Sequence, residues 1–207
     1  MSRGRFVTLE GIEGAGKTSV AQMVLEWLRA RDIAAIATRE PGGTALAERV
    51  RDIVLHASAE HIPPAAETLL MFAARSIHLE NLIRPTLSRG AWVICDRFTD
   101  ATRAYQGAGR GVAAELVEQL AAAVHGDLWP DCTLLLDLPV PLGLQRARAR
   151  AASADRFEQE REPFFERVRS AYLTLAQREP RRIRVIDASR PLESVRADVT
   201  AILEKLL

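Results

Sequence analysis

Hydrophobic residues gather in short uninterrupted runs along this chain, and longer amphipathic stretches lie between the runs. Apolar runs without polar alternation are typical of strands that are buried on both faces of a parallel sheet. The predicted strands are Phe6–Leu9, Ile33–Thr38, Trp92–Cys95, Thr133–Leu136 and Ile183–Ile186.

The stretches between these runs carry apolar residues at helical spacing. In the first stretch, Val20, Val24 and Trp27 share one face, and charged residues lie opposite. Pro85 is expected to bend or end the longest helix, because proline lacks the N–H that an interior helical position needs. The predicted helices cover residues 17–31, 44–55, 64–88, 112–124, 141–150, 162–178 and 192–206.

Strands that alternate with helices predict an α/β fold, with a five-stranded parallel sheet and helices on both of its faces. The length of 207 residues suits one ordinary globular domain, and the chain shows no internal repeat, low-complexity tract or linker. We therefore expect residues 1–207 to form a single domain.

Composition narrows the class of protein. Hydrophobic residues make up 48% of the chain and charged residues 27%, which excludes a disordered chain. A net charge of +1 gives no support to nucleic-acid binding, and no apolar run is long enough to span a membrane. The N-terminus has no targeting pattern, and Cys95 and Cys132 lie inside apolar runs as reduced core residues would. These observations predict a cytoplasmic protein.

Gly11–Thr18 matches the pattern G-x-x-x-x-G-K-[ST] at every position, between a predicted strand and a predicted helix. Glycines let several backbone N–H groups point into one concavity, and the helix N-terminus adds partial positive charge. Lys17 would reach the β- and γ-phosphates of a nucleotide, and the Thr18 hydroxyl would bind Mg²⁺. The motif predicts ATP or GTP binding rather than an ordinary glycine-rich turn. A GTPase is not supported, because the guanine-specifying pattern N-K-x-D is absent.

Charged residues follow several of the predicted strands. Ligands of open α/β sheets bind at the carboxyl ends of the strands, so residues 39–44, 96–98 and 187–191 should converge there. Asp96 is placed to hold Mg²⁺ beside Thr18, directly or through water. Arg97 suits a second phosphate, because a guanidinium offers two parallel donors to phosphate oxygens. A salt bridge from Arg97 to a nearby carboxylate is the alternative.

With these motifs in place, the sequence resembles the bacterial thymidylate kinases. The motifs that carry the resemblance are Glu10–Thr18, Thr38–Thr44, Asp96–Phe98, Ala104–Gly107 and the late arginine-rich stretch. The resemblance covers nearly the whole chain. It implies the nucleoside-monophosphate-kinase fold of P-loop NTPases and the reaction ATP + dTMP → ADP + dTDP with Mg²⁺, a step of dTTP synthesis for DNA replication. It also implies a homodimer, and neither nucleic acid nor a membrane is expected as a partner.

The resemblance further implies roles for individual residues. The ATP site would comprise Gly11, Ile12, Glu13, Gly14, Ala15, Gly16, Lys17, Thr18, Ser19 and Arg190, with Thr18 and Asp96 on the metal. The monophosphate site would comprise Glu40, Pro41, Arg51 and Arg97, with Glu13 near the sugar and the metal. The base and sugar contacts would be Arg75, Thr102, Gln106 and Tyr105, and Tyr105 would crowd a ribose 2′-hydroxyl and so favour deoxynucleotides.

One position departs from the family pattern. The family stacks a phenylalanine on thymine four residues before the position of Arg75, where this chain has Met71 followed by Phe72. Neighbouring residues on a helix differ by about 100° in direction. Either Met71 packs on the base or the helix presents Phe72, and a core role for Phe72 is the alternative.

The arginine-rich stretch is expected to form a lid over residues 146–160. Phosphoryl transfer needs positive charge around the moving group, and the phosphate loop carries no arginine of its own. The resemblance is to family members whose lid supplies this charge. Arg146 and Arg150 share a helix face, and with Arg156 they join Lys17, Arg97 and Glu13 as catalytic candidates. A solvated helix end is the alternative.

Two other functions are kept open at this stage. One is another nucleotide or nucleoside kinase of the same fold, and the other is an ATP-dependent switch protein whose hydrolysis drives partner exchange. The histidines show no zinc-type spacing and are expected to be structural; they are His56, His61, His78 and His125.

Overall fold

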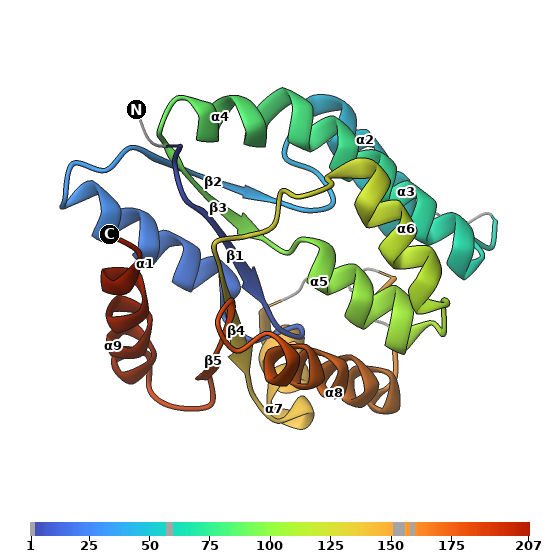
Figure 1. The fold of residues 1–207 in the computed structure, drawn as a ribbon. Helices are drawn as coiled ribbons and strands as arrows, with labels where there is room; N and C mark the ends of the chain where they lie inside the picture. The colour runs from blue at the N-terminus through green and yellow to red at the C-terminus, as the bar shows by residue number, and fades with distance from the viewer. Residues whose placement is uncertain (1–2, 57–59, 151–155, 158–159) are drawn as a thin grey trace.

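The computed structural model describes residues 3–56, 60–150, 156–157 and 160–207. Its centre is a five-stranded sheet in the order β2-β3-β1-β4-β5, and every pairing is parallel (Figure 1). The strands are β1 (Phe6–Glu10), β2 (Ala35–Arg39), β3 (Trp92–Asp96), β4 (Cys132–Asp137) and β5 (Ile183–Asp187). The predicted fold class is confirmed.

Helices follow each strand in turn. They are α1 (Lys17–Arg29), α2 (Ala45–His56), α3 (Pro64–His78), α4 (Arg84–Ser88), α5 (Thr99–Thr102), α6 (Ala114–Val124), α7 (Val140–Arg150), α8 (Glu162–Arg178) and α9 (Leu192–Leu203). Two π-helical segments cover Leu79–Ile83 and Arg103–Gly109, and a 3₁₀ turn covers Glu204–Leu206. Within the described residues, no helix combines the length and the apolar character that crossing a membrane requires.

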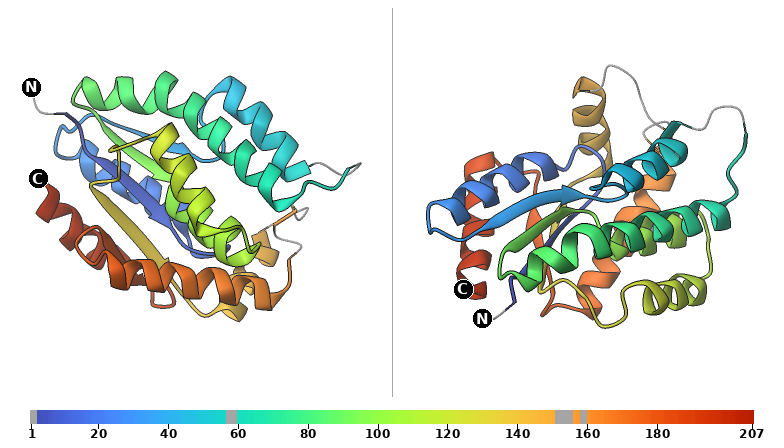
Figure 2. Two further views of the ribbon diagram at one scale, coloured as in Figure 1. Left: turned by 45° about the vertical axis from the view of Figure 1, so that its right-hand side comes forward. Right: turned by 90° about the horizontal axis from the view of Figure 1, so that it is seen from above.

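These helices cover both faces of the sheet. α1 and α9 pack on one face, and α4 and α8 lie on the other (Figures 1 and 2). Phe6 and Val93, which are paired in register, pack on the α4 side, whereas the next pair, Val7 and Ile94, packs on the α1 side. β1, β3 and β4 are buried on both faces, which is the reason why they appear in the sequence as continuous apolar runs, whereas the edge strands β2 and β5 are partly exposed.

The predicted helix over 64–88 is present without a break, but its hydrogen-bond type changes along its length. α3 passes through the π-helical segment into α4, and Pro85 lies in the first turn of α4. A π-helical turn changes which carbonyl each N–H reaches, so the missing N–H of Pro85 interrupts the ladder where it is already irregular. The helix therefore continues to Ser88 instead of ending at Pro85.

One helical region was not predicted. Residues 99–109 form α5 and the second π-helical segment, whereas the sequence pattern predicts no helix between the strand Trp92–Cys95 and residue 112. Glycines at 107, 109 and 111 weaken the local helix preference. Burial of Ala104, Tyr105 and Gln106 by the surrounding elements outweighs it.

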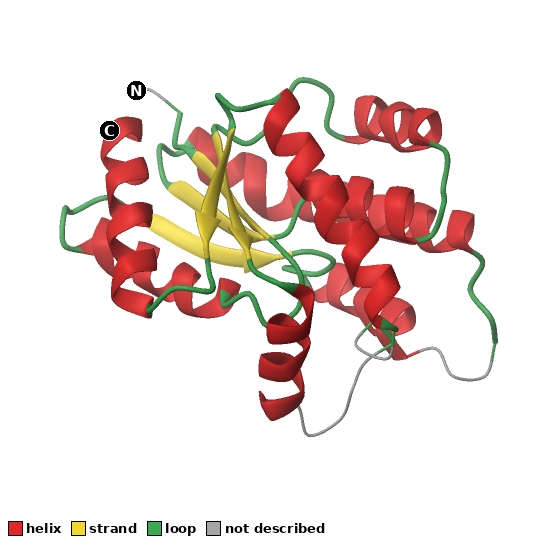
Figure 3. Cartoon of the chain, turned by 90° about the horizontal axis from the view of Figure 1, so that it is seen from below, coloured by secondary structure: helices red, strands yellow, loops and turns green. Residues whose placement is uncertain are grey.

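The carboxyl ends of the strands determine where a ligand can bind. The loops that follow the strands gather at this edge of the sheet, and α7 projects from the body of the molecule beyond it (Figures 2 and 3). The residues predicted to converge at the carboxyl edge therefore have a common location in the fold.

Candidate active site

A tight turn joins β1 to α1. Gly11, Gly14 and Gly16 have positive φ angles of 134°, 73° and 90°. A Cβ atom on Gly14 would lie 2.0 Å from the carbonyl oxygen of Gly143 in α7. Position 14 therefore requires glycine for two reasons: its backbone is left-handed, and α7 approaches too closely to leave room for a side chain.

Lys17 begins α1, and its side chain turns back over this loop. Its Nζ donates to the carbonyl oxygens of Gly11 and Ile12, each at 3.2 Å. Burial, followed by the charge of the nearby Arg97 guanidinium, lowers the pKa of Lys17. A buried amine at a helix N-terminus places two sources of positive potential where a phosphate would bind.

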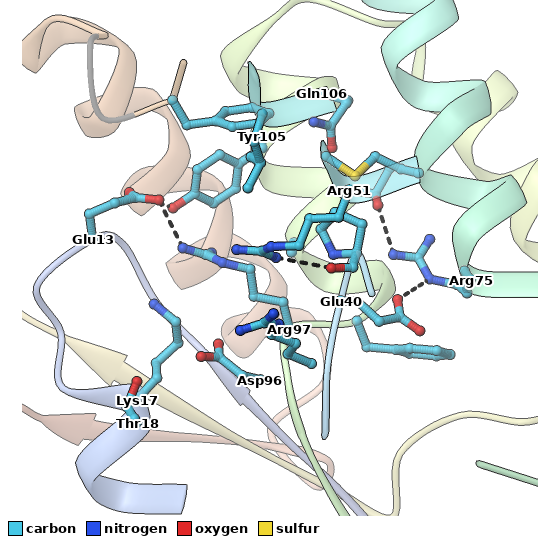
Figure 4. A pocket seen from close by; sticks show the side chains of 18 of the residues that line it. Glu13, Lys17, Thr18, Glu40, Arg51, Arg75, Asp96, Arg97, Tyr105 and Gln106 are labelled. Carbon is cyan, nitrogen blue, oxygen red and sulfur yellow. Dashed lines mark hydrogen bonds and ion pairs between the residues drawn. The ribbon is translucent and has the colours of Figure 1, made fainter. Parts of the chain in front are cut away.

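The loop opens into a cavity of about 520 Å³ (Figure 4). Its walls come from the loops after β1 and β2, from α2 and α3, and from the segment after β3. The predicted site residues that line it are Glu13, Gly14, Gly16, Lys17, Thr18, Ser19, Glu40, Pro41, Arg51, Met71, Arg75, Asp96, Arg97, Thr102, Tyr105 and Gln106. Residues far apart in the sequence thus meet around one space.

Asp96 ends β3 near Lys17 and Thr18 (Figure 4). Its Oδ1 is buried and has no hydrogen-bond partner among the residues that the structure describes. A buried carboxylate oxygen is costly unless a donor or a cation binds it. Thr18 and Asp96 both line the cavity, and oxygen atoms are the ligands that Mg²⁺ prefers. This donor set fits a magnesium ion.

Arg97 has a left-handed backbone, with φ at 73°, which is uncommon for a residue with a side chain. Its guanidinium donates to Glu13 Oε1 at 2.9 Å and to the carbonyl oxygen of Gly11 at 3.1 Å. The Tyr105 hydroxyl donates to the other carboxylate oxygen of Glu13 at 2.8 Å, and the Arg97 guanidinium lies over the Tyr105 ring. The salt bridge foreseen as an alternative for Arg97 is therefore present inside the cavity itself.

A second carboxylate lies behind Arg97. Glu10 is fully buried and accepts hydrogen bonds from the backbone N–H of Phe98 at 2.7 Å and from the Tyr172 hydroxyl at 2.6 Å. Burial, and then the charge of Asp100, raise the pKa of Glu10 to about 8. Because Phe98 directly follows Arg97, Glu10 supports the turn that presents the arginine.

Arg75 of α3 lies at the other end of the cavity and is 2% exposed. Its Nε donates to Glu40 Oε2 at 2.7 Å, and its Nη2 donates to Thr102 Oγ1 at 3.1 Å. Its Nη1 has no hydrogen-bond partner within the described part of the chain. Nearby, Gln106 donates to Glu67 at 2.8 Å. This end of the cavity therefore presents the buried Nη1 of Arg75 as a hydrogen-bond donor, whereas the other end presents the loop Gly11–Thr18.

Comparisons with known proteins agree with this geometry. The family model described as thymidylate kinase matches residues 9–199. The thymidylate kinases of Alkalilimnicola ehrlichii and Alcanivorax borkumensis are 55% and 53% identical to the chain, over 100% and 98% of it and over 94% and 97% of their own lengths. The chain belongs to the thymidylate kinase family. The crystal structure of thymidylate kinase from Ehrlichia chaffeensis matches the fold with a TM-score of 0.78 at 33% identity, covering 98% of this chain and 99% of that one.

In this member of the thymidylate kinase family, Met71 lines the cavity and Phe72 does not. Phe72 is buried and packs with Val117 and Ala121 of α6, and the guanidinium of Arg75 lies 4.6 Å from the centre of its ring. Phe72 thus has the core position that was its alternative. Met71 is the member of the pair that faces the space for a ligand.

Three predicted residues of the phosphate loop lie behind the cavity lining. Ile12 and Ala15 are buried in the main hydrophobic core, and the carbonyl oxygen of Gly11 faces Lys17 and Arg97. These residues shape the loop through its backbone and its anchoring in the core.

The predicted lid arginines have separate partners. Arg146 donates to the carbonyl oxygen of Ala188 at 2.9 Å, whereas Arg156 pairs with Glu67 and donates to the carbonyl oxygen of Val54 at 3.1 Å. The side chain of Arg150 and residues 151–155 and 158–159 of the predicted lid lie outside the described part of the structure.

Arg190 is also away from the cavity lining. It pairs with Asp198 of α9 at 2.8 Å, and the two side chains are 46% and 40% exposed.

Arg39 and Phe98 also line the cavity and belong to the segments 39–44 and 96–98 that were expected to converge here, although neither had an individual role predicted. Phe157 lines it too and belongs to the predicted lid over 146–160. The cavity residues outside any predicted site segment are Leu55 and Ala101. Phe157 packs edge-on against Tyr105, with 5.9 Å between ring centroids. Phe98 and Phe157 each follow an arginine of a predicted motif, which was an available signal. Leu55 and Ala101 gave none, because apolar residues on amphipathic helices are ordinarily core residues.

Proposed function

We propose that the protein transfers the γ-phosphoryl group of ATP to dTMP and forms ADP and dTDP. The observation that carries the proposal is a single cavity with two unlike ends. Lys17 and Thr18 line one end, Arg75 lines the other, and Arg97 lies between them (Figure 4). Such a cavity suits a triphosphate and a nucleoside monophosphate whose phosphates face each other. Membership of the thymidylate kinase family points to thymidine as the nucleoside.

At the ATP end, the backbone N–H groups of residues 11–16 and the Lys17 amine would hold the β- and γ-phosphates. Thr18 and Asp96 would hold Mg²⁺, which when bound neutralises charge on the phosphate oxygens. Preorganised positive charge of this kind stabilises the transition state without moving during the reaction. A general base is not needed, because the dTMP phosphate is already an anionic nucleophile.

Arg97 would orient the accepting phosphate, with Arg51 beside it. Glu13 and the carbonyl oxygen of Gly11 fix two edges of the Arg97 guanidinium before any substrate arrives. An acceptor held in line with the γ-phosphate reacts within one complex, so most of the translational and rotational entropy has already been lost on binding.

Arg75, Thr102 and Gln106 would recognise the base, and Met71 would pack against it. The unused Nη1 of Arg75 needs an acceptor, which thymine supplies as a carbonyl oxygen. Cytosine has an amino group at C4, where thymine has a carbonyl oxygen. If Nη1 faces this position, cytosine would leave Nη1 unpaired and should be rejected. Tyr105 would crowd a ribose 2′-hydroxyl and so favour deoxynucleotides.

Residues 146–160 would act as the lid of a single catalytic domain that spans residues 1–207. Arg146, Arg150 and Arg156 would bring positive charge to the transferring phosphoryl group when the lid closes, and Arg190 would contribute to the ATP side. Closure would also exclude water and so disfavour hydrolysis of ATP.

We further propose a homodimer through the outer faces of α2 and α3. Leu46, Ile53 and Leu69 are each about half exposed, at 51%, 53% and 52%, and they belong to two helices that pack together. A second copy that covered these side chains would remove one apolar patch from water, which is what a dimer interface does. Buried, unpaired Cys95 and Cys132 support a reducing, cytoplasmic setting.

The decisive test is ADP release from Mg·ATP with dTMP, dUMP, UMP, dCMP, AMP, GMP or no acceptor. Fast turnover mainly with dTMP, together with dTDP as product, is the expected result. Preference for another monophosphate would replace the base assignments and leave a kinase of the same fold. Equal ADP release without any acceptor would overturn the kinase proposal in favour of an ATP-dependent switch.

A further inference from the structure

A buried chain of hydrogen bonds lies behind the base end of the cavity. Thr38 Oγ1 lies 2.7 Å from His78 Nε2, and His78 Nδ1 lies 3.0 Å from Glu40 Oε1. The other oxygen of Glu40 accepts a hydrogen bond from Arg75 Nε at 2.7 Å. His78 is completely buried and does not line the cavity. This series of hydrogen bonds therefore connects β2 to Arg75 through a histidine that a ligand in the cavity would not contact.

The partners of His78 determine which ring nitrogen carries hydrogen. A carboxylate only accepts hydrogen bonds, so we assign the N–H to Nδ1, which donates to Glu40. In the neutral ring Nε2 is then the acceptor, and the Thr38 hydroxyl donates to it. His78 is therefore the second donor to Glu40, besides Arg75.

The position of Glu40 fixes the direction of Arg75. Glu40 holds Nε and Thr102 holds Nη2, and the guanidinium is planar and rigid, so the direction of Nη1 follows from these two bonds. The rings of Phe72 and Phe98 lie 4.6 and 5.1 Å from the guanidinium carbon and limit its movement. Any shift of Glu40 would therefore be transmitted to Nη1.

His78 also supports the turn that carries Glu40. A Cβ atom on Gly43 would lie 2.4 Å from His78 Nε2 and 2.5 Å from Thr38 Oγ1, so the backbone of this turn rests directly on the pair. The same turn includes Pro41, whose carbonyl oxygen accepts a hydrogen bond from Arg51 at 2.9 Å. Two sides of the proposed acceptor site thus depend on one imidazole.

A metal ion is the alternative reason to gather these side chains. Ligand atoms of Glu40, His78 and Cys95 lie within 4.8 Å of one another. However, both ring nitrogens of His78 already have partners, the cationic Arg75 is bonded to Glu40, and burial raises the pKa of the Cys95 thiol. A cation would face repulsion and a protonated thiol, so the hydrogen-bonded arrangement is the favoured one.

We propose that His78 is a positioning residue for base recognition: its Nδ1–H fixes Glu40, and Glu40 aims Arg75 at the base. This inference rests on the proposed function, because it gives Arg75 a base to recognise. It assigns to His78 a role in substrate discrimination in place of the purely structural role that the sequence predicts.

Two amide variants separate the two ends of the imidazole. His78→Asn keeps a donor near the position of Nδ1, whereas His78→Gln places its amide near Nε2 and leaves Glu40 without its second donor. We expect the KM for dTMP to rise about tenfold in His78→Gln and in His78→Leu, with kcat and the KM for ATP within about threefold of wild type. His78→Asn should restore the KM to within about threefold. The preference for dTMP over dCMP should fall in His78→Gln and His78→Leu and stay near that of the wild type in His78→Asn.

A matched control uses another buried histidine that bonds a threonine. His125 is 2% exposed, and its Nε2 lies 2.9 Å from Thr99 Oγ1. His125→Leu should lower the melting temperature as His78→Leu does but leave the KM for dTMP unchanged. Equal impairment of His78→Asn and His78→Gln, or an unchanged KM in His78→Leu, would overturn the positioning role.

The two proposals fail in different ways. If the wild-type protein prefers another monophosphate, the proposed function is overturned. The KM values of His78→Asn and His78→Gln for that monophosphate would then still decide the role of His78. A wild type that prefers dTMP, with no difference between the Asn and Gln variants, would overturn the role of His78 alone.

Discussion

Buried and partly buried charged side chains hold one another in place around the proposed acceptor phosphate site. Glu13 joins Arg97 to Tyr105, and Glu10 lies behind them against the Phe98 N–H and the Tyr172 hydroxyl. Removing one partner of such a pair leaves the other buried and uncompensated, which costs more than the bond itself contributes. Single substitutions here should therefore act through the arrangement of Arg97 as well as through the lost contact.

Glu10 should make the stability of the protein depend on pH. Its pKa is raised from 4.5 to about 8 by burial and then by Asp100, so the folded state binds the proton more tightly than the unfolded state. Its contribution to stability is therefore fully present below about pH 4.5 and is lost as the pH rises through about 8. Glu10→Gln does not ionise, so its free energy of unfolding should gain on that of the wild type between about pH 4.5 and about pH 8.

Urea unfolding at several pH values measures this difference. A constant gap between wild type and Glu10→Gln over that range would show that the carboxyl group does not titrate there.

At the scale of elements, the phosphate loop is held by α7 as well as by its own strand and helix. Gly14 lies against Gly143, so the loop and the first turn of α7 have no room between them for a side chain. This contact couples the loop that would bind ATP to α7, the helix that leads into the proposed lid.

Gly14→Ala should therefore impair ATP binding beyond its backbone strain. The added methyl group would meet the Gly143 carbonyl oxygen and displace the loop, and we expect the KM for ATP to rise at least about tenfold. Gly126→Ala is the control, because Gly126 also has a positive φ of 56° but its nearest neighbour would be 3.8 Å away. Steady-state kinetics that show the same KM for ATP in both variants would contradict the steric argument.

A separate prediction concerns the arginines of α7, which leads into the proposed lid. Arg150→Ala should lower kcat at least about tenfold with little change in the KM for dTMP, because the arginine would act only on the moving phosphoryl group. Arg148 is exposed and lies about 160° around the helix from Arg150, on the face opposite the predicted catalytic pair. Arg148→Ala should therefore keep wild-type kcat, and equal losses in the two variants would indicate a general charge effect.

At the scale of the whole molecule, the exposed apolar side chains of α2 and α3 allow the proposed dimer to be tested by substitution. Ile53→Lys should dissociate the proposed dimer, because a buried lysine without a partner would face the apolar surface of the second copy. Leu192 on α9 is 60% exposed and lies outside this surface, so Leu192→Lys is the control. Light scattering during gel filtration should give a monomer for Ile53→Lys and a dimer for Leu192→Lys and the wild type. A monomeric wild type would contradict the dimer.

Much of this protein follows from local sequence. The central strands β1, β3 and β4 appear as apolar runs because both of their faces are covered, and Gly11–Thr18 carries its glycines and Lys17 in one short segment. The carboxyl-edge rule then predicts that Asp96 and Arg97 lie near this loop, as the cavity lining shows. Each of these inferences needs only neighbouring residues or a general property of parallel sheets.

Other features were decided by contacts between distant segments. Residues 99–109 are helical because Tyr105 and Gln106 are buried against other elements, despite weak local preference. The choice between Met71 and Phe72 depends on α6, which buries Phe72 and leaves Met71 to the cavity. His78 has an ordinary place on α3 in the sequence, and only the approach of Thr38 and Glu40 gives its two nitrogens their partners. Periodicity and motifs describe one segment at a time, whereas these three outcomes depend on the packing energy between segments.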